Sequence, residues 1–128
     1  YQKSKKEVER IKLNQNGQYI VKGIINGKGL SFLVDTGANT IALSSIEAER
    51  LGIDYQNEGR RSESTTAGGK ASGFEMVLKE VTVGHITLRN IQAMIIEGQW
   101  PEVPLLGMSF LKHLDMKYDD NILELTKD

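Results

Sequence analysis

Residues Phe32–Thr40 read Phe-Leu-Val-Asp-Thr-Gly-Ala-Asn-Thr. An apolar run leads directly into a carboxylate, a hydroxyl and a glycine. Because Asp and Gly are depleted in strands, the pattern predicts a turn at Asp35–Gly37. The apolar pattern resumes at Ile41–Leu43. The sequence therefore predicts one acid at the end of a buried strand, on a loop that Gly37 allows to bend sharply.

A second motif of this kind lies near the end of the chain. Leu105–Leu111 contains two apolar residues, then Gly107, then residues that predict a short helix. A glycine at such a position permits the close approach of two backbone segments. Alone, the pattern is typical of an ordinary strand-to-helix turn.

Composition limits the classes of function. The 128 residues suffice for one domain with its own core. With 16 basic and 17 acidic residues the net charge is -1, and no long basic stripe appears, so we expect no nucleic-acid partner. The absence of cysteine excludes disulfides and thiol catalysis, and two histidines make a metal site improbable. The apolar runs are far shorter than a membrane span, so we expect no membrane contact by this segment.

The first half of the chain predicts strands, a hairpin and a helix. Residues 1–10 are polar and rich in Lys and Glu, and we interpret them as an arm or linker before a domain at 11–128. Asn26-Gly27 between two β-branched runs is a strong hairpin signal. Residues 44–52 predict a short helix, with Ser44 and Glu47 as a capping box and a glycine stop at its end.

The second half predicts short antiparallel strands. Apolar and polar residues alternate from Phe74 to Ile95, and turn signals at Gly84 and Asn90 separate the runs. Asp119–Asn121 predicts a turn before a closing strand. Strands this short and frequent indicate an all-β barrel with one or two short helices.

The polar segment at residues 59–73 has two interpretations. The first is a surface loop. The second is a hairpin whose Gly68-Gly69 tip forms a mobile flap, because Gly-Gly is a good hairpin turn and lids need such freedom.

Three of these segments together resemble the retropepsin-like aspartic peptidases of clan AA. They are Phe32–Thr40, the helix ending at Leu51-Gly52, and Leu105–Leu111. The closest resemblance is to the single-lobed, often membrane-anchored bacterial members, and it extends from about Gly17 to Leu125. It implies a single-lobe acid protease barrel in which the Leu-Gly strand crosses behind the acid loop. It also favours the flap over the surface loop.

The resemblance implies roles for the matching residues. Asp35 is the catalytic acid, and Thr36 locks the acid loops of two copies together. Support of the acid loop is expected from Thr36, Gly37, Leu106 and Gly107. Asn39 stands where retroviral enzymes usually carry an acid. The residues expected to contact substrate are Gly37, Ala38, Asn39, Thr66, Ala67, Gly68, Gly69 and Lys70.

The chemistry of an aspartic site sets the remaining expectations. Two carboxylates must share one proton, yet only Asp35 lies in the required setting, whereas Asp115, Asp119 and Asp120 read as turn or surface acids. We therefore expect an aspartic endopeptidase that acts on protein or peptide as a homodimer, with no cofactor and no metal. The alternative is a catalytically silent module for dimerisation or peptide binding. We interpret Trp100 as a packing residue.

The resemblance also carries an expectation about location. Because the related bacterial members are often membrane-anchored, we expect a periplasmic or otherwise extracytoplasmic protein. Its anchor would precede the polar arm and lie outside this chain.

Overall fold

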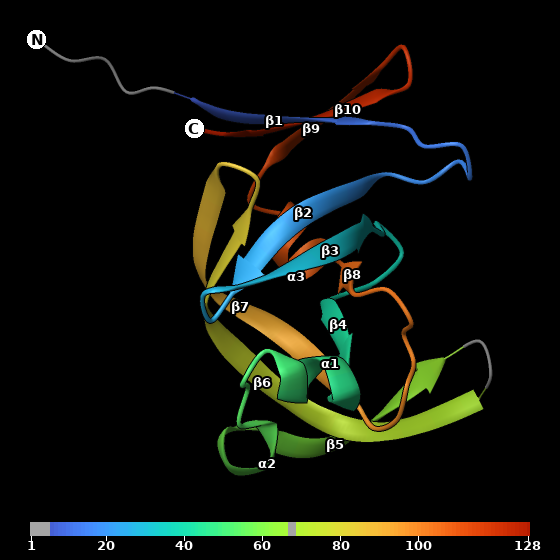
Figure 1. Ribbon diagram of the computed structural model, residues 1–128, viewed down its shortest axis with the longest axis vertical. Coiled ribbons are helices and arrows are strands. Elements are labelled where there is room, and N and C mark those ends of the chain that lie inside the picture. The colour runs from blue at the N-terminus through green and yellow to red at the C-terminus, as the bar shows by residue number, and fades with distance from the viewer. Residues whose placement is uncertain (1–5, 67–68) are drawn as a thin grey trace, which may run out of the picture.

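The computed structural model describes residues 6–66 and 69–128 and confirms an all-β fold. The described strands are β1 (Glu7–Lys12), β2 (Ile20–Ile25), β3 (Lys28–Val34), β4 (Ile41–Ser44), β5 (Arg60–Thr66), β6 (Gly69–Val83), β7 (Ile86–Ile96), β8 (Leu105–Leu106), β9 (Asp115–Asp119) and β10 (Ile122–Lys127). Seven of them form a sheet in the order β2-β3-β8-β4-β7-β6-β5, and an added β2–β6 pairing curls it into a barrel. A smaller sheet, β1-β10-β9, covers one end of this barrel (Figure 1).

The β2–β3 hairpin confirms the Asn-Gly prediction. Asn26 and Gly27 have φ values of 55° and 74°, and the strands pair from Ile25 opposite Lys28 onward. Positive φ at both turn residues matches the right-handed twist of the flanking strands. The hairpin therefore fixes the register of β3, which delivers Asp35 at its far end.

Strand β1 differs from the expected arm. Glu7–Lys12 pairs with β10 along its whole length, and the Ile11 side chain is buried. The prediction of an arm reaching Arg10 is therefore wrong at its last residues. The polar residues at the start of β1 gave no strand signal, because their charged side chains lie at the surface. There Arg10 contacts Glu124 at 3.0 Å. Residues 1–5 lie outside the described part.

Strands β6 and β7 are longer than the sequence predicted. They form one antiparallel ribbon from Gly73 opposite Ile96 to Val83 opposite Ile86. The turn signal at Gly84 is correct, because Gly84 lies between the two strands with φ 58°. The signal at Asn90 is wrong as a strand end. Asn90 has φ 59° inside β7, but the register on either side of it is unchanged, so the ribbon continues.

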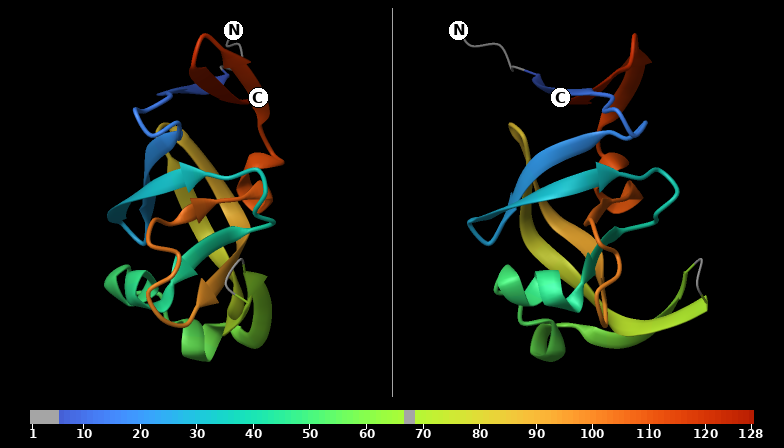
Figure 2. Two further views of the ribbon diagram at one scale, coloured as in Figure 1. Left: turned by 90° about the vertical axis from the view of Figure 1, so that its right-hand side faces the viewer. Right: turned by 45° about the vertical axis from the view of Figure 1, so that its right-hand side comes forward.

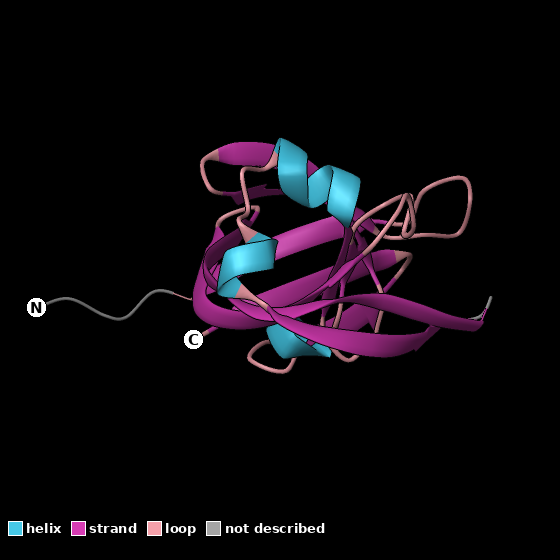
Figure 3. Ribbon diagram, turned by 90° about the horizontal axis from the view of Figure 1, so that it is seen from below, coloured by secondary structure: helices cyan, strands magenta, loops and turns pink. Residues whose placement is uncertain are grey.

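The described helices are short and lie at the periphery of the β-structure (Figure 3). They are α1 (Ser45–Arg50), α2 (Tyr55–Glu58) and α3 (Met108–Leu111). The Oγ of Ser44 accepts a hydrogen bond from the N–H of Glu47 at 3.1 Å, which caps α1 as predicted. Helix α2 was not predicted, and with it the described residues form three helices. None of these helices is long and apolar enough to cross a membrane.

The core connects the two motifs on which the fold prediction depends. Phe32 from β3, Leu106 from β8 and Phe110 from α3 are fully buried in one apolar cluster, together with Leu43 and Ile95. Burying such side chains contributes roughly 1.5–3 kcal/mol each. The acid loop and the Gly107 segment are therefore anchored in the same core on both sides of the site.

Candidate active site

Asp35 follows β3 in a loop whose geometry is set by short-range hydrogen bonds. Its backbone N–H donates to the carbonyl oxygen of Leu106 at 3.0 Å, and its own carbonyl oxygen accepts from the N–H of Ala38 at 3.2 Å. The carboxylate oxygen Oδ1 accepts from the N–H of Gly37 at 2.9 Å. A hydrogen bond to a charged acceptor is stronger than one between neutral groups. The carboxylate of Asp35 is therefore held in one orientation.

The structure gives Gly37 a different role from the one predicted. Its φ is not positive, so a sharp left-handed bend does not explain the glycine. Instead, a Cβ at this position would lie 3.2 Å from Oδ1 of Asp35, which is tighter than ordinary van der Waals contact. Glycine thus allows the amide to approach the carboxylate closely.

Leu106 and Gly107 cross directly behind the acid loop. A Cβ on Gly107 would lie 2.1 Å from the carbonyl oxygen of Thr40 and 2.7 Å from that of Ala38. The N–H groups that follow it bind the same loop, since Met108 donates to Ala38 at 2.8 Å. The acid loop consequently has a rigid support that only a residue without a side chain can provide.

Ser109 is a structural residue that the sequence analysis missed. Its side chain is buried, and its Oγ accepts from the N–H of Ile41 at 3.1 Å while donating to the carbonyl oxygen of Gln92 at 2.7 Å. Its N–H also binds the carbonyl oxygen of Asn39 at 2.9 Å. One residue thereby ties α3 to β4, β7 and the acid loop. Nothing local in the sequence distinguishes it from a surface serine.

A cleft of about 330 Å³ opens in front of Asp35. This volume lies within the range of ligand pockets in proteins. The acid loop forms one side, and Thr65 of β5 faces it from the flap hairpin. The described residues that line the cleft are Asp35, Gly37, Ala38, Asn39, Thr40, Ala42, Thr65, Met94, Ile96, Trp100 and Leu105.

The segment predicted as a flap is a hairpin. β5 and β6 pair up to Thr66 opposite Gly69, with Thr65 opposite Lys70, and the hairpin projects beyond the barrel (Figure 2). The interpretation as an irregular surface loop is therefore wrong. Ala67 and Gly68, predicted at the tip, lie outside the described residues, as does the side chain of Thr66.

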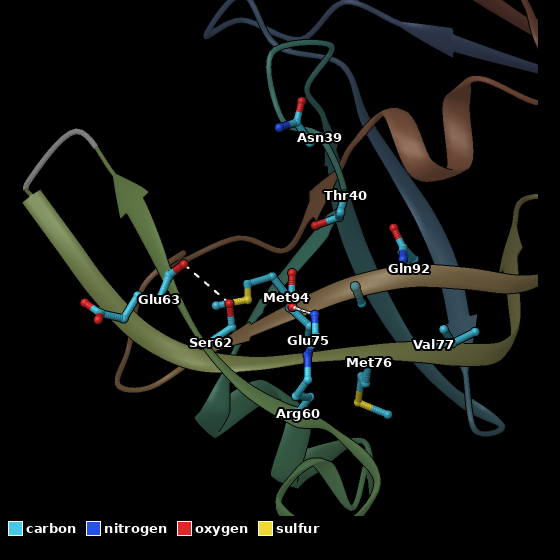
Figure 4. A pocket seen from close by; sticks show the side chains of 11 residues that line it. Asn39, Thr40, Arg60, Ser62, Glu63, Glu75, Met76, Val77, Gln92 and Met94 are labelled. Atoms are coloured by element: carbon cyan, nitrogen blue, oxygen red, sulfur yellow. Dashed lines mark hydrogen bonds and ion pairs between the residues drawn. The ribbon is translucent and has the colours of Figure 1, made fainter.

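A second hollow of about 370 Å³ continues the cleft along β7 (Figure 4). The two spaces share Asn39, Thr40 and Met94. An ion pair occupies the second one, where Arg60 and Glu75 lie 2.6 Å apart on paired positions of β5 and β6. The hydrogen bond to Glu75 raises the pKa of the Arg60 guanidinium. Together the two hollows make a groove beneath the flap hairpin.

Two predicted residues face outward. The side chain of Thr36 is exposed and forms no hydrogen bond within the described part of the chain. Asn39 is exposed and borders both hollows, so its amide is accessible from the groove. The intrachain contacts of the acid loop therefore leave both side chains available to other molecules.

Trp100 is not the packing residue that we predicted. Its side chain is 48% exposed and lines the cleft that contains Asp35. It stands in the loop between β7 and β8, whose course depends on contacts with distant segments. The sequence around Trp100 gave no sign of where this side chain would lie.

The histidines lie away from this cleft. His85 follows the β6 strand and its Nδ1 lies 3.0 Å from a carboxylate oxygen of Glu9, while His113 borders a separate surface hollow. Within residues 6–66 and 69–128, no three His, Asp or Glu side chains are grouped to hold a metal ion. The described chemistry of the cleft is that of one carboxylate among neutral polar and apolar groups.

Comparison with known proteins identifies the class. A family model described as "gag-polyprotein putative aspartyl protease" matches residues 21–113. A retropepsin-like aspartic protease from Rickettsia conorii has a similar structure, with a TM-score of 0.80 and 29% identity over 99% of this chain and 97% of that one. The fold is that of a retropepsin-like aspartic peptidase. The chain belongs to the aspartyl protease family that the model describes.

Two curated relatives are similar in sequence. A Sinorhizobium protein named "Uncharacterized protein in cobV 5'region" is 41% identical over 101 residues, and protein RP867 of Rickettsia prowazekii is 30% identical over 111 residues. The matches cover 79% and 86% of this chain, but 43% and 47% of the relatives. The chain thus spans less than half the length of the curated relatives it matches.

Proposed function

We propose that the protein is an aspartic endopeptidase that hydrolyses peptide bonds as a homodimer. The observation that carries the proposal is the carboxylate of Asp35, which is held by the N–H of Gly37 at 2.9 Å and lines a cleft beneath a flap hairpin. In this reaction one carboxylate takes a proton from water, while a neutral carboxyl group polarises the scissile carbonyl.

The second carboxyl group comes from a second copy of the chain. Among the described residues that line the cleft, Asp35 is the one acid. Two carboxyl groups in contact cannot both ionise, so the pair retains one proton over a range of pH. A two-fold axis between the two acid loops provides this arrangement, because a two-fold interface brings identical surfaces together.

The outward position of Thr36 supports such an interface. Its exposed hydroxyl has no partner within the described chain, so it is available to the backbone of the facing loop. The rigid support beneath the acid loop also favours catalysis, since it positions the carboxylate before a partner arrives. The projecting β5–β6 hairpin is placed to cover a bound peptide and exclude water.

A proposal about the location of the protein accompanies the proposed activity. We propose an extracytoplasmic domain tethered through its N-terminal side. The support is the resemblance to membrane-anchored bacterial members, together with the start of β1 on the side of the molecule away from the flap hairpin (Figure 1). A tether there leaves the groove accessible.

Incubation with a mixed peptide library at acid pH tests the function. We expect endoproteolytic cleavage of the peptides. A statine-type inhibitor should abolish this cleavage, and a metal chelator should leave its rate unchanged. The rate should pass through a maximum on the acid side of neutral, because the dyad must hold one proton. Peptide binding without cleavage under all conditions would instead support a silent binding module. Rates that still rise above about pH 8 would contradict an aspartic mechanism.

A further inference from the structure

Strand β6 lacks a partner along part of one side. Its first half pairs with β5 as far as Glu75 opposite Arg60, and its end pairs with β2 from Thr82 opposite Ile24. Between these two pairings, at residues 76–81, no other strand of the described chain pairs with β6 on this side. We call these residues the open edge. An edge of this kind presents backbone groups with which an extended segment can pair.

The backbone groups of Val77 point toward the open edge. The carbonyl oxygen of Ser72 on β6 accepts from the N–H of Glu97, just after β7, at 2.9 Å, so Ser72 faces the β7 side. Backbone groups of successive residues in a strand alternate between its two edges, and the register of β6 with β7 is regular over this segment. Glu75 and Val77 consequently face the opposite side, and Val77 lies beyond the first residue of β5.

A third hollow, of about 380 Å³, lies along the open edge. Residues 76–79 of β6 line it together with Asn26 of the β2–β3 turn and Glu58 of α2. The hollow shares Met76 and Val77 with the second hollow of the groove beneath the flap hairpin. The groove that begins at Asp35 therefore continues along β6 to the open edge.

The side chains of the open edge alternate between two sides of β6. Figure 4 shows Val77 and Met76 on opposite sides of the strand. Val77 is 51% exposed, whereas the next residue, Leu78, is buried in the core. A segment paired with β6 would place its own successive side chains alternately on the same two sides. An apolar side chain of such a segment can therefore cover Val77.

The charges around the third hollow favour a basic ligand. Asp54 and Glu58 are exposed acids that line it, and Lys79 is the one base among the described residues that do so. Neither acid belongs to an ion pair of the described chain. Because exposed ion pairs contribute little affinity, we expect these acids to select for Lys or Arg and the strand pairing to supply most of the binding.

We propose that the open edge is an exosite that binds a basic, extended segment of the substrate as an added strand beside β6, away from the bond that is cleaved. This proposal rests on the endopeptidase function for the identity of the ligand. The continuous groove is the reason to expect substrate, because a peptide bound across Asp35 can continue along β6 without leaving the groove. Pairing with Val77 adds backbone hydrogen bonds, and the acids add the preference for basic side chains.

Hydrogen exchange of the Asp35→Asn variant, followed by nuclear magnetic resonance, tests binding without cleavage. The probes are an octapeptide from the mixed library that binds this variant, and the same peptide lengthened by Lys-Val-Lys-Val at one end or the other. We expect one lengthened peptide, and not the parent, to slow exchange of the Val77 amide by about 10-fold or more. Exchange of this amide that is unchanged at saturating concentrations of both lengthened peptides would overturn the proposal.

The steady-state kinetics of the wild type give the second measurement. An added strand contacts substrate and transition state equally, so one lengthened peptide should have a KM about 10-fold below that of the parent, with little change in kcat. The same peptide with N-methyl groups on the added residues keeps its side chains but loses its backbone donors, and it should show no such gain. An equal gain for the N-methylated peptide, or equal KM values for the parent and both lengthened peptides, would overturn the proposal.

Glu58→Lys tests the preference for a basic segment, and Asp119→Lys is its matched control. Both substitutions change the net charge by the same amount, and Asp119 is an exposed acid on β9 that lines none of the three hollows. Glu58→Lys should remove most of the gain in KM that lengthening gives, whereas Asp119→Lys should retain it. Equal gains in the two variants would contradict the basic preference. Slower exchange of the Val77 amide without cleavage by the wild type would leave the binding site standing and contradict only the endopeptidase function.

Discussion

Asp35→Asn is expected to abolish peptide hydrolysis while leaving the fold intact. General acid–base groups contribute about 10²- to 10⁴-fold to rates, and this substitution removes the acid from both halves of the proposed dyad. The amide is nearly isosteric, and its Oδ1 still accepts the hydrogen bond that the N–H of Gly37 donates at 2.9 Å. The measurement is cleavage of a fluorogenic peptide, with circular dichroism as the test of folding.

Asp115→Asn is the matched control for this experiment. Asp115 is an exposed carboxylate on β9 and does not line the groove, so its loss should leave the rate close to that of wild type. Activity of Asp35→Asn within a few fold of wild type, in a preparation free of other peptidases, would remove Asp35 from the mechanism.

Gly107→Ala is expected to cause a large loss of stability. The backbone of Gly107, at φ −95° and ψ −170°, is one that alanine adopts freely, so conformational strain is not the cause. The added Cβ would instead lie 2.1 Å from the carbonyl oxygen of Thr40, which belongs to the backbone and has no free rotation to move away. Overpacking of this kind costs about 1–3 kcal/mol, and occasionally more.

Urea unfolding compares this variant with Gly29→Ala. A Cβ on Gly29 in β3 would have its nearest neighbour, the carbonyl oxygen of Gly23, at 3.9 Å, so we expect unchanged or slightly higher stability there. Gly107→Ala should also lose activity in its folded fraction, because the loop that carries Asp35 must shift. Equal free energies of unfolding for the two variants would show that the backbone at Gly107 does not pack closely against the acid loop.

The parts of the fold that local chemistry dictates were predicted from the sequence. Asn26-Gly27 favours one hairpin geometry, and Ser44 with Glu47 favours a helix start, because each depends on residues within a few positions. The first residues of strand β1, Glu7–Arg10, were missed because their partner, β10, lies at the other end of the chain. Asn90 was wrongly predicted to end a strand. Its positive φ is tolerated inside β7, because the residues on either side of it keep the same register with β6.

The candidate site shows the same division. Asp35 and Gly107 were found because an acid after an apolar run and a glycine at a close approach leave a pattern in the sequence. Ser109 and Trp100 were not, since the contacts that place them join segments far apart, as between Ser45 and Gly98. The reason why residue 37 is a glycine could not be predicted either, because it depends on the distance between a Cβ at this position and the carboxylate of Asp35.

The central claim is that one active site needs Asp35 from two copies, and a mixing experiment tests it most directly. Wild-type chain is allowed to exchange subunits with a ninefold excess of Asp35→Asn, and native mass spectrometry verifies that mixed dimers form. If both carboxylates are required and subunits pair at random, activity per wild-type chain should fall to about one tenth. Activity per wild-type chain that stays constant while mixed dimers are present would contradict the shared site.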